Sequence, residues 1–111
     1  MNISWSEIKP YENELPTNYA DRIGRLYTDT VTSAFKKSNG QFFTPVSIAY
    51  FMGKQISVNK DSVSVLDPGC GTAILSCAVI ENLVLQSKVK RIKLVTYETD
   101  ENLIPGLQKV L

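Results

Sequence analysis

The part of the sequence with the clearest potential for chemistry is the segment VSVLDPGCGTA at residues 63–73. It reads as a strand, a glycine turn and the start of a helix. Gly69 and Gly71 let the backbone approach a ligand closely, and free amides at the start of a helix attract an anionic group. Open α/β sheets bind ligands at the carboxyl ends of their strands. The segment therefore predicts a nucleotide-like ligand at this place, although a tight turn alone would also explain the two glycines.

The residues around the turn narrow the choice of ligand. A phosphate-binding P-loop needs a lysine after its last glycine, but Thr72 and Ala73 follow Gly71, which disfavours a nucleoside triphosphatase. A dinucleotide site would have a third glycine where this chain has Ile74. Asp67 would repel a pyrophosphate and attract an ammonium or a sulfonium group. S-adenosylmethionine carries both of these cations, so we expect it to be the cofactor.

Acidic residues also follow the next predicted strand, at residues 91–97. Glu98, at the carboxyl end of that strand, can accept hydrogen bonds from both ribose hydroxyls of an adenosine ligand. It lies 98 − 67 = 31 residues after Asp67, further than the roughly 20 residues of a dinucleotide site, and a long intervening helix accounts for the difference. Asp100 could lie near the adenine amine or stabilise the turn, and we favour the turn, where aspartate is common.

A third segment, GQFFTP at residues 40–45, precedes an apolar helix. A glycine that ends one helix and a proline that begins the next explain part of it. Together with DPGCGT at residues 67–72 and YETD at residues 97–100, however, the segment resembles the opening of the N6-adenine DNA methyltransferases of restriction-modification systems. In that family these three motifs occur in this order and bind the cofactor. The resemblance begins at Gly40 and ends near Leu107.

The resemblance implies a set of residues that bind S-adenosylmethionine: Phe43, Thr44, Asp67, Gly69, Gly71 and Glu98. The first two would contact the methionine part, the next three would line the cofactor, and the glutamate would hold the ribose. Ala73 departs from the family, which usually has a glycine here, and its methyl group would be tolerated but would tighten the pocket. The implied activity is methyl transfer to adenine N6 in double-stranded DNA by the full-length protein.

The catalytic motif of that family is missing from this chain. The family holds the flipped adenine with an Asn/Asp-Pro-Pro-aromatic motif, whereas all five prolines here are isolated. We therefore expect no catalytic residue in this chain, and no activity from it alone. The apolar, uncapped end at Val110 and Leu111 leads us to expect a fragment of a longer enzyme. Other readings are a non-catalytic α/β binding module, a methyltransferase that acts on RNA or protein, and a dehydrogenase half, which Asp67 and the missing third glycine oppose.

Two helices are expected ahead of the glycine turn. After an irregular arm over residues 1–16, apolar spacing predicts an amphipathic helix over residues 17–35, with Thr17 or Asn18 as its N-cap and Gly40 as its stop. The second helix should start with Pro45 as its first residue, after Thr44 as N-cap, and end near residue 57.

The remaining elements predict a parallel βαβ unit. We expect strands over residues 62–66 and 91–97, an all-round apolar helix over residues 72–86 between them, and a last helix from about residue 102. The fold class is α/β: an incomplete, three-layer, Rossmann-like methyltransferase fold preceded by N-terminal helices. Residues 1–39 would form the arm and helix, and residues 40–111 the first part of the S-adenosylmethionine-binding domain. Because the apolar helix lacks its natural cover in a fragment, we expect exposed apolar surface and self-association.

The composition excludes several other classes of protein. With 111 residues, 43% of them hydrophobic, and a net charge of +1, the chain fits one domain and does not require a membrane or a polyanion as partner. The N-terminus lacks the apolar segment of a signal peptide, and the apolar stretch at residues 73–85 is too short to span a bilayer. We therefore expect a cytoplasmic protein.

The cysteines and the basic residues are expected to lie outside the chemistry. Because the chain has no histidine, Cys70 and Cys77 cannot complete a structural zinc site, and we expect two buried thiols without a metal. The densest basic cluster reads as a solvated loop, which is the usual role of a charge run before a strand. It consists of Lys88, Lys90, Arg91 and Lys93.

Overall fold

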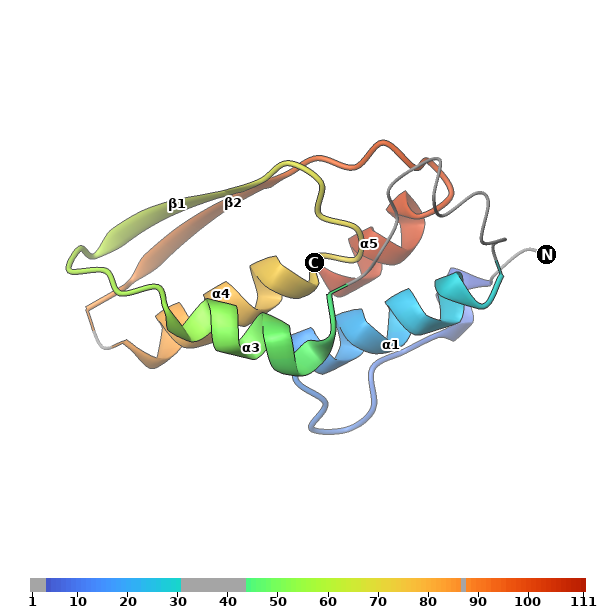
Figure 1. Cartoon of the computed structure of the whole chain (residues 1–111), viewed down its shortest axis with the longest axis horizontal. Coiled ribbons are helices and arrows are strands. Elements are labelled where there is room, and N and C mark those ends of the chain that lie inside the picture. The colour runs from blue at the N-terminus through green and yellow to red at the C-terminus, as the bar shows by residue number, and fades with distance from the viewer. Residues whose placement is uncertain (1–3, 31–43, 87) are drawn as a thin grey trace.

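The computed structural model of the chain describes residues 4–30, 44–86 and 88–111. The described elements are the 3-10 helix η1 (Trp5–Glu7), the helices α1 (Pro16–Thr28), α3 (Val46–Lys54), α4 (Ile74–Leu85) and α5 (Ile104–Val110), and the strands β1 (Ser62–Asp67) and β2 (Arg91–Thr96). The two strands lie side by side, with α3 and α4 beneath them, and α1 and α5 lie toward their carboxyl ends (Figure 1).

The strand pair is parallel, as the sequence predicts. The register places Asp67, the last residue of β1, opposite Thr96, the last residue of β2. Backbone pairing continues past both strands, because Tyr97 N donates to Asp67 O at 3.0 Å and Cys70 N donates to Tyr97 O at 3.1 Å. The loops that leave the two strands are therefore hydrogen-bonded to each other.

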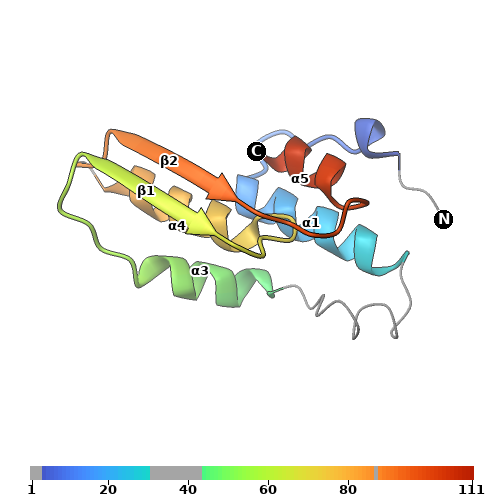
Figure 2. The same ribbon diagram turned by 90° about the horizontal axis from the view of Figure 1, so that it is seen from above.

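The strands have one covered face and one open face. Along β1 the half-buried residues Val63 and Val65 alternate with exposed ones, and Leu66 is 64% exposed. Seen from above, the strand pair lies over α4, with α3 alongside (Figure 2). The described residues thus form two layers, one of strands and one of helices. The expectation of a three-layer fold is wrong for these residues, because no described element covers the outer face of the strands.

Small residues allow the helices beneath the strands to pack closely. Ala20 of α1 and Ala49 of α3 form one buried cluster with Ile74, Cys77 and Ala78 of α4. Helix α4 is therefore covered by two other helices, which meets the need of its all-round apolar sequence, and the expectation that it lacks cover in this chain is wrong for most of its length. Its last turn is an exception, since Val84 and Leu85 are 67% and 85% exposed.

Helix α1 begins one residue earlier than predicted, because its N-terminus is stabilised from another helix. Leu15, rather than Thr17 or Asn18, occupies the N-cap position and makes no side-chain cap hydrogen bond. Instead, the backbone N–H of Thr17 donates to the carboxylate of Glu81 in α4 at 3.0 Å, and the Thr17 hydroxyl donates to the same oxygen. A carboxylate at the amino end of a helix also interacts favourably with the helix dipole.

Helix α1 also ends earlier than predicted, at Thr28 rather than near residue 35. Asp29 and Thr30 form a turn, in which Thr30 N donates to Tyr27 O at 3.0 Å. The rest of the predicted helix and its expected stop at Gly40 lie within residues 31–43, outside the described residues.

The starts of α3 and α4 differ from the prediction because of the backbone angles of the N-cap residues that precede them. Pro45 has an extended ψ of 147° and is the N-cap of α3, a position predicted for Thr44. Helix α3 ends at Lys54, three residues before the predicted end. Helix α4 starts at Ile74, two residues late, because Ala73 has a left-handed φ of 67°.

The N-terminal arm packs against α1 and α5. Arg22 of α1 pairs with Glu14 at 2.8 Å and lies over the ring of Tyr11 at 4.0 Å. At the other end of the arm, a Cβ added to Gly106 of α5 would lie 2.8 Å from the ring of Trp5, which shows how closely the arm packs on α5. Within residues 4–30, 44–86 and 88–111, no helix is long and apolar enough to cross a membrane.

The close contact between α3 and α4 predicts the effect of a side chain at Gly53. A Cβ at this position would lie 2.9 Å from the backbone C and O atoms of Ala78, so Gly53→Ala would force the helices apart. We expect a loss of about 1 to 3 kcal/mol in the free energy of unfolding, measured by urea denaturation, which is the usual cost of overpacking a core. Ser47→Ala is the control: it adds helix propensity at an exposed position of α3 and should not destabilise the chain. A Gly53→Ala variant as stable as the parent would contradict the packing.

Candidate functional site

The side chain of Glu98 lies between the two loops that leave the strands. Gly71 N, in the loop after β1, donates to Glu98 Oε1 at 2.9 Å. Asp100 N, in the loop after β2, donates to Glu98 Oε2 at 2.8 Å. The half-buried carboxylate therefore accepts one bond from each loop. Because each carboxylate oxygen has two lone pairs, each can still accept a bond from a ligand hydroxyl.

The protein's own structure requires a glycine at only one of the two glycine positions of the turn. Gly71 has a φ of 55°, in the left-handed region that strains other residues. Gly69 is exposed, and a Cβ added to it would meet no atom within 4 Å. The protein's own packing therefore requires no glycine at position 69. Open space beside this backbone is what a bound ligand would need for close approach.

Asp67 is held by a hydroxyl from α4. It ends β1 and is half-buried, and Ser76 Oγ donates to its Oδ2 at 2.6 Å. Asp67 and Glu98 thus place two carboxylates at the carboxyl ends of neighbouring strands, which favours a ligand with positive charge over a pyrophosphate.

The structure brings together four of the six predicted site residues. The turn hydrogen bonds and the strand register link Asp67, Gly69, Gly71 and Glu98 at one end of the strand pair. Thr44 is half-buried just before α3, two residues from Val46, which packs against the cluster that contains Ile74 of α4. Phe43 lies outside the described residues.

Asp100 stabilises the turn after β2, as we favoured from the sequence. Its Oδ1 accepts a bond from Asn102 N at 3.0 Å, and its backbone O accepts one from Leu103 N at 3.0 Å. Its other carboxylate oxygen accepts a bond from the hydroxyl of Tyr27 in α1.

The loop amides are less available to an anion than the sequence suggested. Gly71 N is bound to Glu98, and Ala73 N donates to Cys70 O at 2.7 Å. The expectation of free amides at the helix start is therefore wrong for these two, because a carboxylate and a carbonyl within the protein already accept from them.

Both cysteines are buried free thiols, as predicted. Burial raises the pKa of the Cys77 thiol to about 12. Burial, with a smaller contribution from the Asp67 carboxylate, also raises the pKa of the Cys70 thiol. Both thiols are therefore protonated at neutral pH, and the thiolate that nucleophilic chemistry requires is disfavoured.

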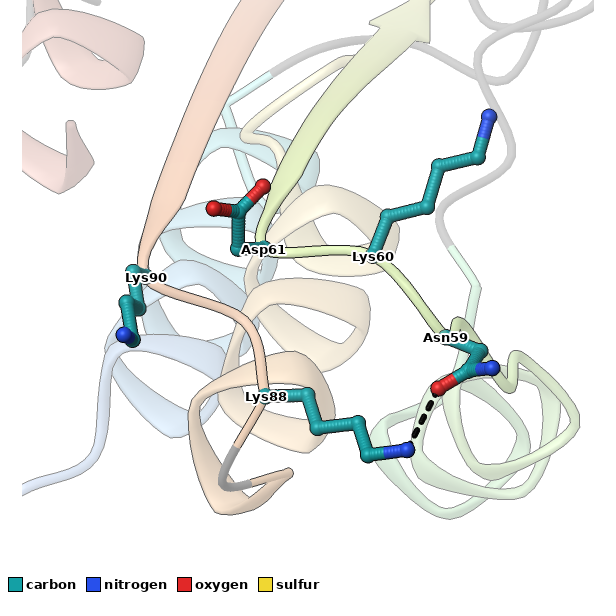
Figure 3. A pocket seen from close by; sticks show the side chains of 5 residues that line it. All are labelled: Asn59, Lys60, Asp61, Lys88 and Lys90. Atoms are coloured by element: carbon teal, nitrogen blue, oxygen red, sulfur yellow. Dashed lines mark hydrogen bonds between the residues drawn. The ribbon is translucent and has the colours of Figure 1, made fainter.

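A shallow pocket lies at the opposite, amino end of the strands (Figure 3), lined by Asn59, Lys60, Asp61, Lys88 and Lys90. Lys88 Nζ donates to Asn59 Oδ1 at 2.6 Å. The four residues of the predicted basic cluster are all exposed, but only Lys88 and Lys90 lie in the predicted solvated loop, because Arg91 and Lys93 belong to β2. Because the pocket is at the far end of the strands from the glycine turn, we keep it apart from the candidate site.

Three side chains that support the site were missed from the sequence. Ser76 holds Asp67, the hydroxyl of Tyr27 donates to Asp100, and Thr72 Oγ1 donates to Ala20 O at 2.8 Å, which ties the glycine turn to α1. A serine inside an apolar helix was the one available signal, because a buried hydroxyl needs a partner.

Comparison with known proteins identifies the class of the chain. The N-6 DNA Methylase family matches residues 18–105, from α1 into α5. The chain therefore belongs to the N-6 DNA methylase family. The match includes the glycine turn, Glu98 and most of α1.

Two curated relatives are type II methyltransferases. The chain is 36% identical over 87 residues to the type II methyltransferase M.AccI of Acinetobacter calcoaceticus. The aligned region covers 78% of this chain and 15% of the relative. It is 38% identical over 77 residues to the type II methyltransferase M.BsuBI of Bacillus subtilis. Here the aligned region covers 68% of this chain and 15% of the relative. The chain thus spans about 15% of the length of these relatives. No solved structure matches it.

The contrast between the two glycines predicts different effects on stability. Gly71→Ala places a side chain in the left-handed region and should lower the free energy of unfolding by about 1 to 2 kcal/mol. Gly69→Ala meets open space at a φ that is not positive, and should leave the free energy of unfolding unchanged or slightly higher. Thermal unfolding followed by circular dichroism measures both. Equal losses in the two variants would show that the turn geometry is misassigned.

Proposed function

We propose that this chain is the cofactor-binding part of an S-adenosylmethionine-dependent DNA methyltransferase that modifies adenine N6 in a restriction-modification system. The observation that carries the proposal is the Glu98 carboxylate, which lies between the glycine turn and the loop after β2. Membership of the N-6 DNA methylase family supports the adenine specificity, and the names of the two type II relatives support the biological system.

The described residues fit the cofactor. Glu98 has lone pairs for the ribose hydroxyls, Gly69 leaves space beside its backbone, and the Asp67 carboxylate suits the positive charges of the methionine part. Phe43 and Thr44 would contact the methionine part, as the family resemblance implies. When bound, S-adenosylmethionine supplies an activated methyl group on its sulfonium. This chain's own residues would bind and orient it.

The proposed substrate is double-stranded DNA, recognised through the full-length protein in the cytoplasm. We further propose that residues 40–111 form the first part of a Rossmann-like methyltransferase domain, and that residues 1–39 form its arm and leading helix. The parallel strand pair supports the assignment of residues 40–111. A methyltransferase acting on RNA or protein shares the cofactor motifs, but GQFFTP at residues 40–45 favours DNA.

Glu98→Ala tests the cofactor site. We expect it to weaken S-adenosylhomocysteine binding by about 1.5 to 3 kcal/mol, the range for a hydrogen bond to a charged group. Isothermal titration calorimetry of the 111-residue chain measures the difference. Glu101→Ala removes an equal charge from an exposed position nearby and should bind like the parent. Equal affinity of Glu98→Ala and the parent would refute the role of Glu98, and equal losses in both variants would indicate a general charge effect instead.

The chain alone should transfer no methyl group. The exocyclic amine of adenine is a weak nucleophile that must be flipped out of the duplex and oriented by acceptors. The family's Asn/Asp-Pro-Pro-aromatic motif performs this work, and every proline in the chain is isolated. The measurement is transfer of labelled methyl groups to unmethylated DNA. Turnover that Glu98→Ala abolishes would show that the active site is complete in these 111 residues.

The isolated chain should self-associate through α3. Ile48, Phe51 and Met52 follow helical spacing and are 50%, 66% and 47% exposed, so they form a continuous apolar surface. Light scattering should show a mass that rises with concentration, and Phe51→Ser should reduce the rise. Leu111→Ser removes a leucine that is 58% exposed elsewhere and serves as control. A monomer at all concentrations would contradict this expectation.

A further inference from the structure

The hydroxyl of Tyr27 connects helix α1 to the loop that follows β2. It donates to Asp100 Oδ2, although the two residues are 73 positions apart in sequence. The ring of Tyr27 is 4% exposed and stacks on Trp5, with 6.3 Å between ring centroids and 28° between their planes. The hydroxyl is therefore held in place by packing on both the helix and the arm.

Asp100 links the position of the Tyr27 hydroxyl to that of the Glu98 carboxylate. Its side chain accepts from Tyr27 and from Asn102 N, which fixes the direction of the turn. The backbone N–H of Asp100 in turn donates to Glu98 Oε2 at 2.8 Å. The orientation of the Glu98 carboxylate thus depends on two donors, Gly71 N in the glycine turn and Asp100 N in the turn that Tyr27 contacts.

We propose that Tyr27 is a positioning residue for the cofactor site, which acts through Asp100 to aim the Glu98 carboxylate at the ribose hydroxyls. The inference rests on the proposed function, because it assigns Tyr27 a role in the binding that Glu98 performs. Without the hydroxyl, the turn at Asp100 loses one of its anchors, and its N–H holds Glu98 Oε2 less firmly. The lone pairs that face the ribose are then less well aligned, since hydrogen bonds weaken when their geometry departs from linear.

Tyr27→Phe tests this role because it keeps the ring against Trp5 and removes the hydroxyl. Tyr19→Phe is the matched control: it lies on the same helix, its side chain is equally buried at 3% exposure, and its hydroxyl donates to Ile8 O at 2.6 Å, away from Glu98. Each variant of the full 111-residue chain is titrated with S-adenosylhomocysteine and with its 2′,3′-dideoxy analogue, which lacks the ribose hydroxyls.

A positioning role predicts a loss that depends on the ribose hydroxyls. Tyr27→Phe should bind S-adenosylhomocysteine about three- to tenfold more weakly than the parent, as expected for partial loss of a hydrogen bond to a charged group. Its affinity for the dideoxy analogue should equal that of the parent, and Tyr19→Phe should bind both ligands like the parent. Unchanged S-adenosylhomocysteine affinity in Tyr27→Phe, or equal losses for the two ligands, would overturn the inference, because a merely structural role affects both.

A measurement without ligand separates this inference from the proposed function. The amide resonances of Gly71 and Asp100 report the two bonds to Glu98, and both should shift in Tyr27→Phe but not in Tyr19→Phe. Unchanged resonances in Tyr27→Phe would overturn the inference. If the parent binds no S-adenosylhomocysteine, or if Glu98→Ala binds it as well as the parent, the proposed function fails, while the amide shifts still decide whether Tyr27 positions Glu98.

Discussion

The carboxylate of Glu98 accepts a hydrogen bond from each of the two loops at the carboxyl ends of the strands, through Gly71 N at 2.9 Å and Asp100 N at 2.8 Å. Parallel neighbouring strands bring these loops to the same edge, and besides the direct bond from Cys70 N to Tyr97 O, Glu98 satisfies one half-buried amide in each loop. An acceptor is needed for each amide, because an amide without a partner away from water costs about 1 to 3 kcal/mol. The same side chain therefore organises the loops and supplies the proposed ribose contact, so binding and loop geometry are coupled.

The helices hold in place the two loops that the Glu98 carboxylate joins. Glu81 of α4 accepts bonds from Thr17 of α1 and, at 3.4 Å, from the hydroxyl of Tyr50 in α3, so one carboxylate joins three helices. At the other end of α4, the hydroxyl of Thr72 donates to Ala20 O of α1. Helix α1 is thus attached to both ends of the α4 region. This explains how a helix that contributes no predicted site residue can influence the loops.

The sequence was sufficient for features that depend on local patterns. The order of strand, glycine turn, helix and strand predicted the parallel pairing, and the residue types at positions 67, 69, 71 and 98 predicted which residues lie together at the strand ends. Contacts between distant elements were not predictable, because no local pattern records them. The cap that Glu81 provides for α1 and the bond from Tyr27 to Asp100 both depend on tertiary packing.

Ala73 shows how packing can offset an unfavourable backbone. It adopts φ 67° and ψ 30°, a left-handed conformation that costs an L-residue roughly 1 to 2 kcal/mol. Its methyl group is fully buried in a cluster with Cys70 and Leu107, and burying one such group contributes about 0.8 kcal/mol. The two effects are of similar size, which is why an alanine is compatible with a position where the family usually has glycine. Since the methyl packs toward α5, its contribution is to the core beneath the glycine turn, and the turn itself keeps the open space beside Gly69.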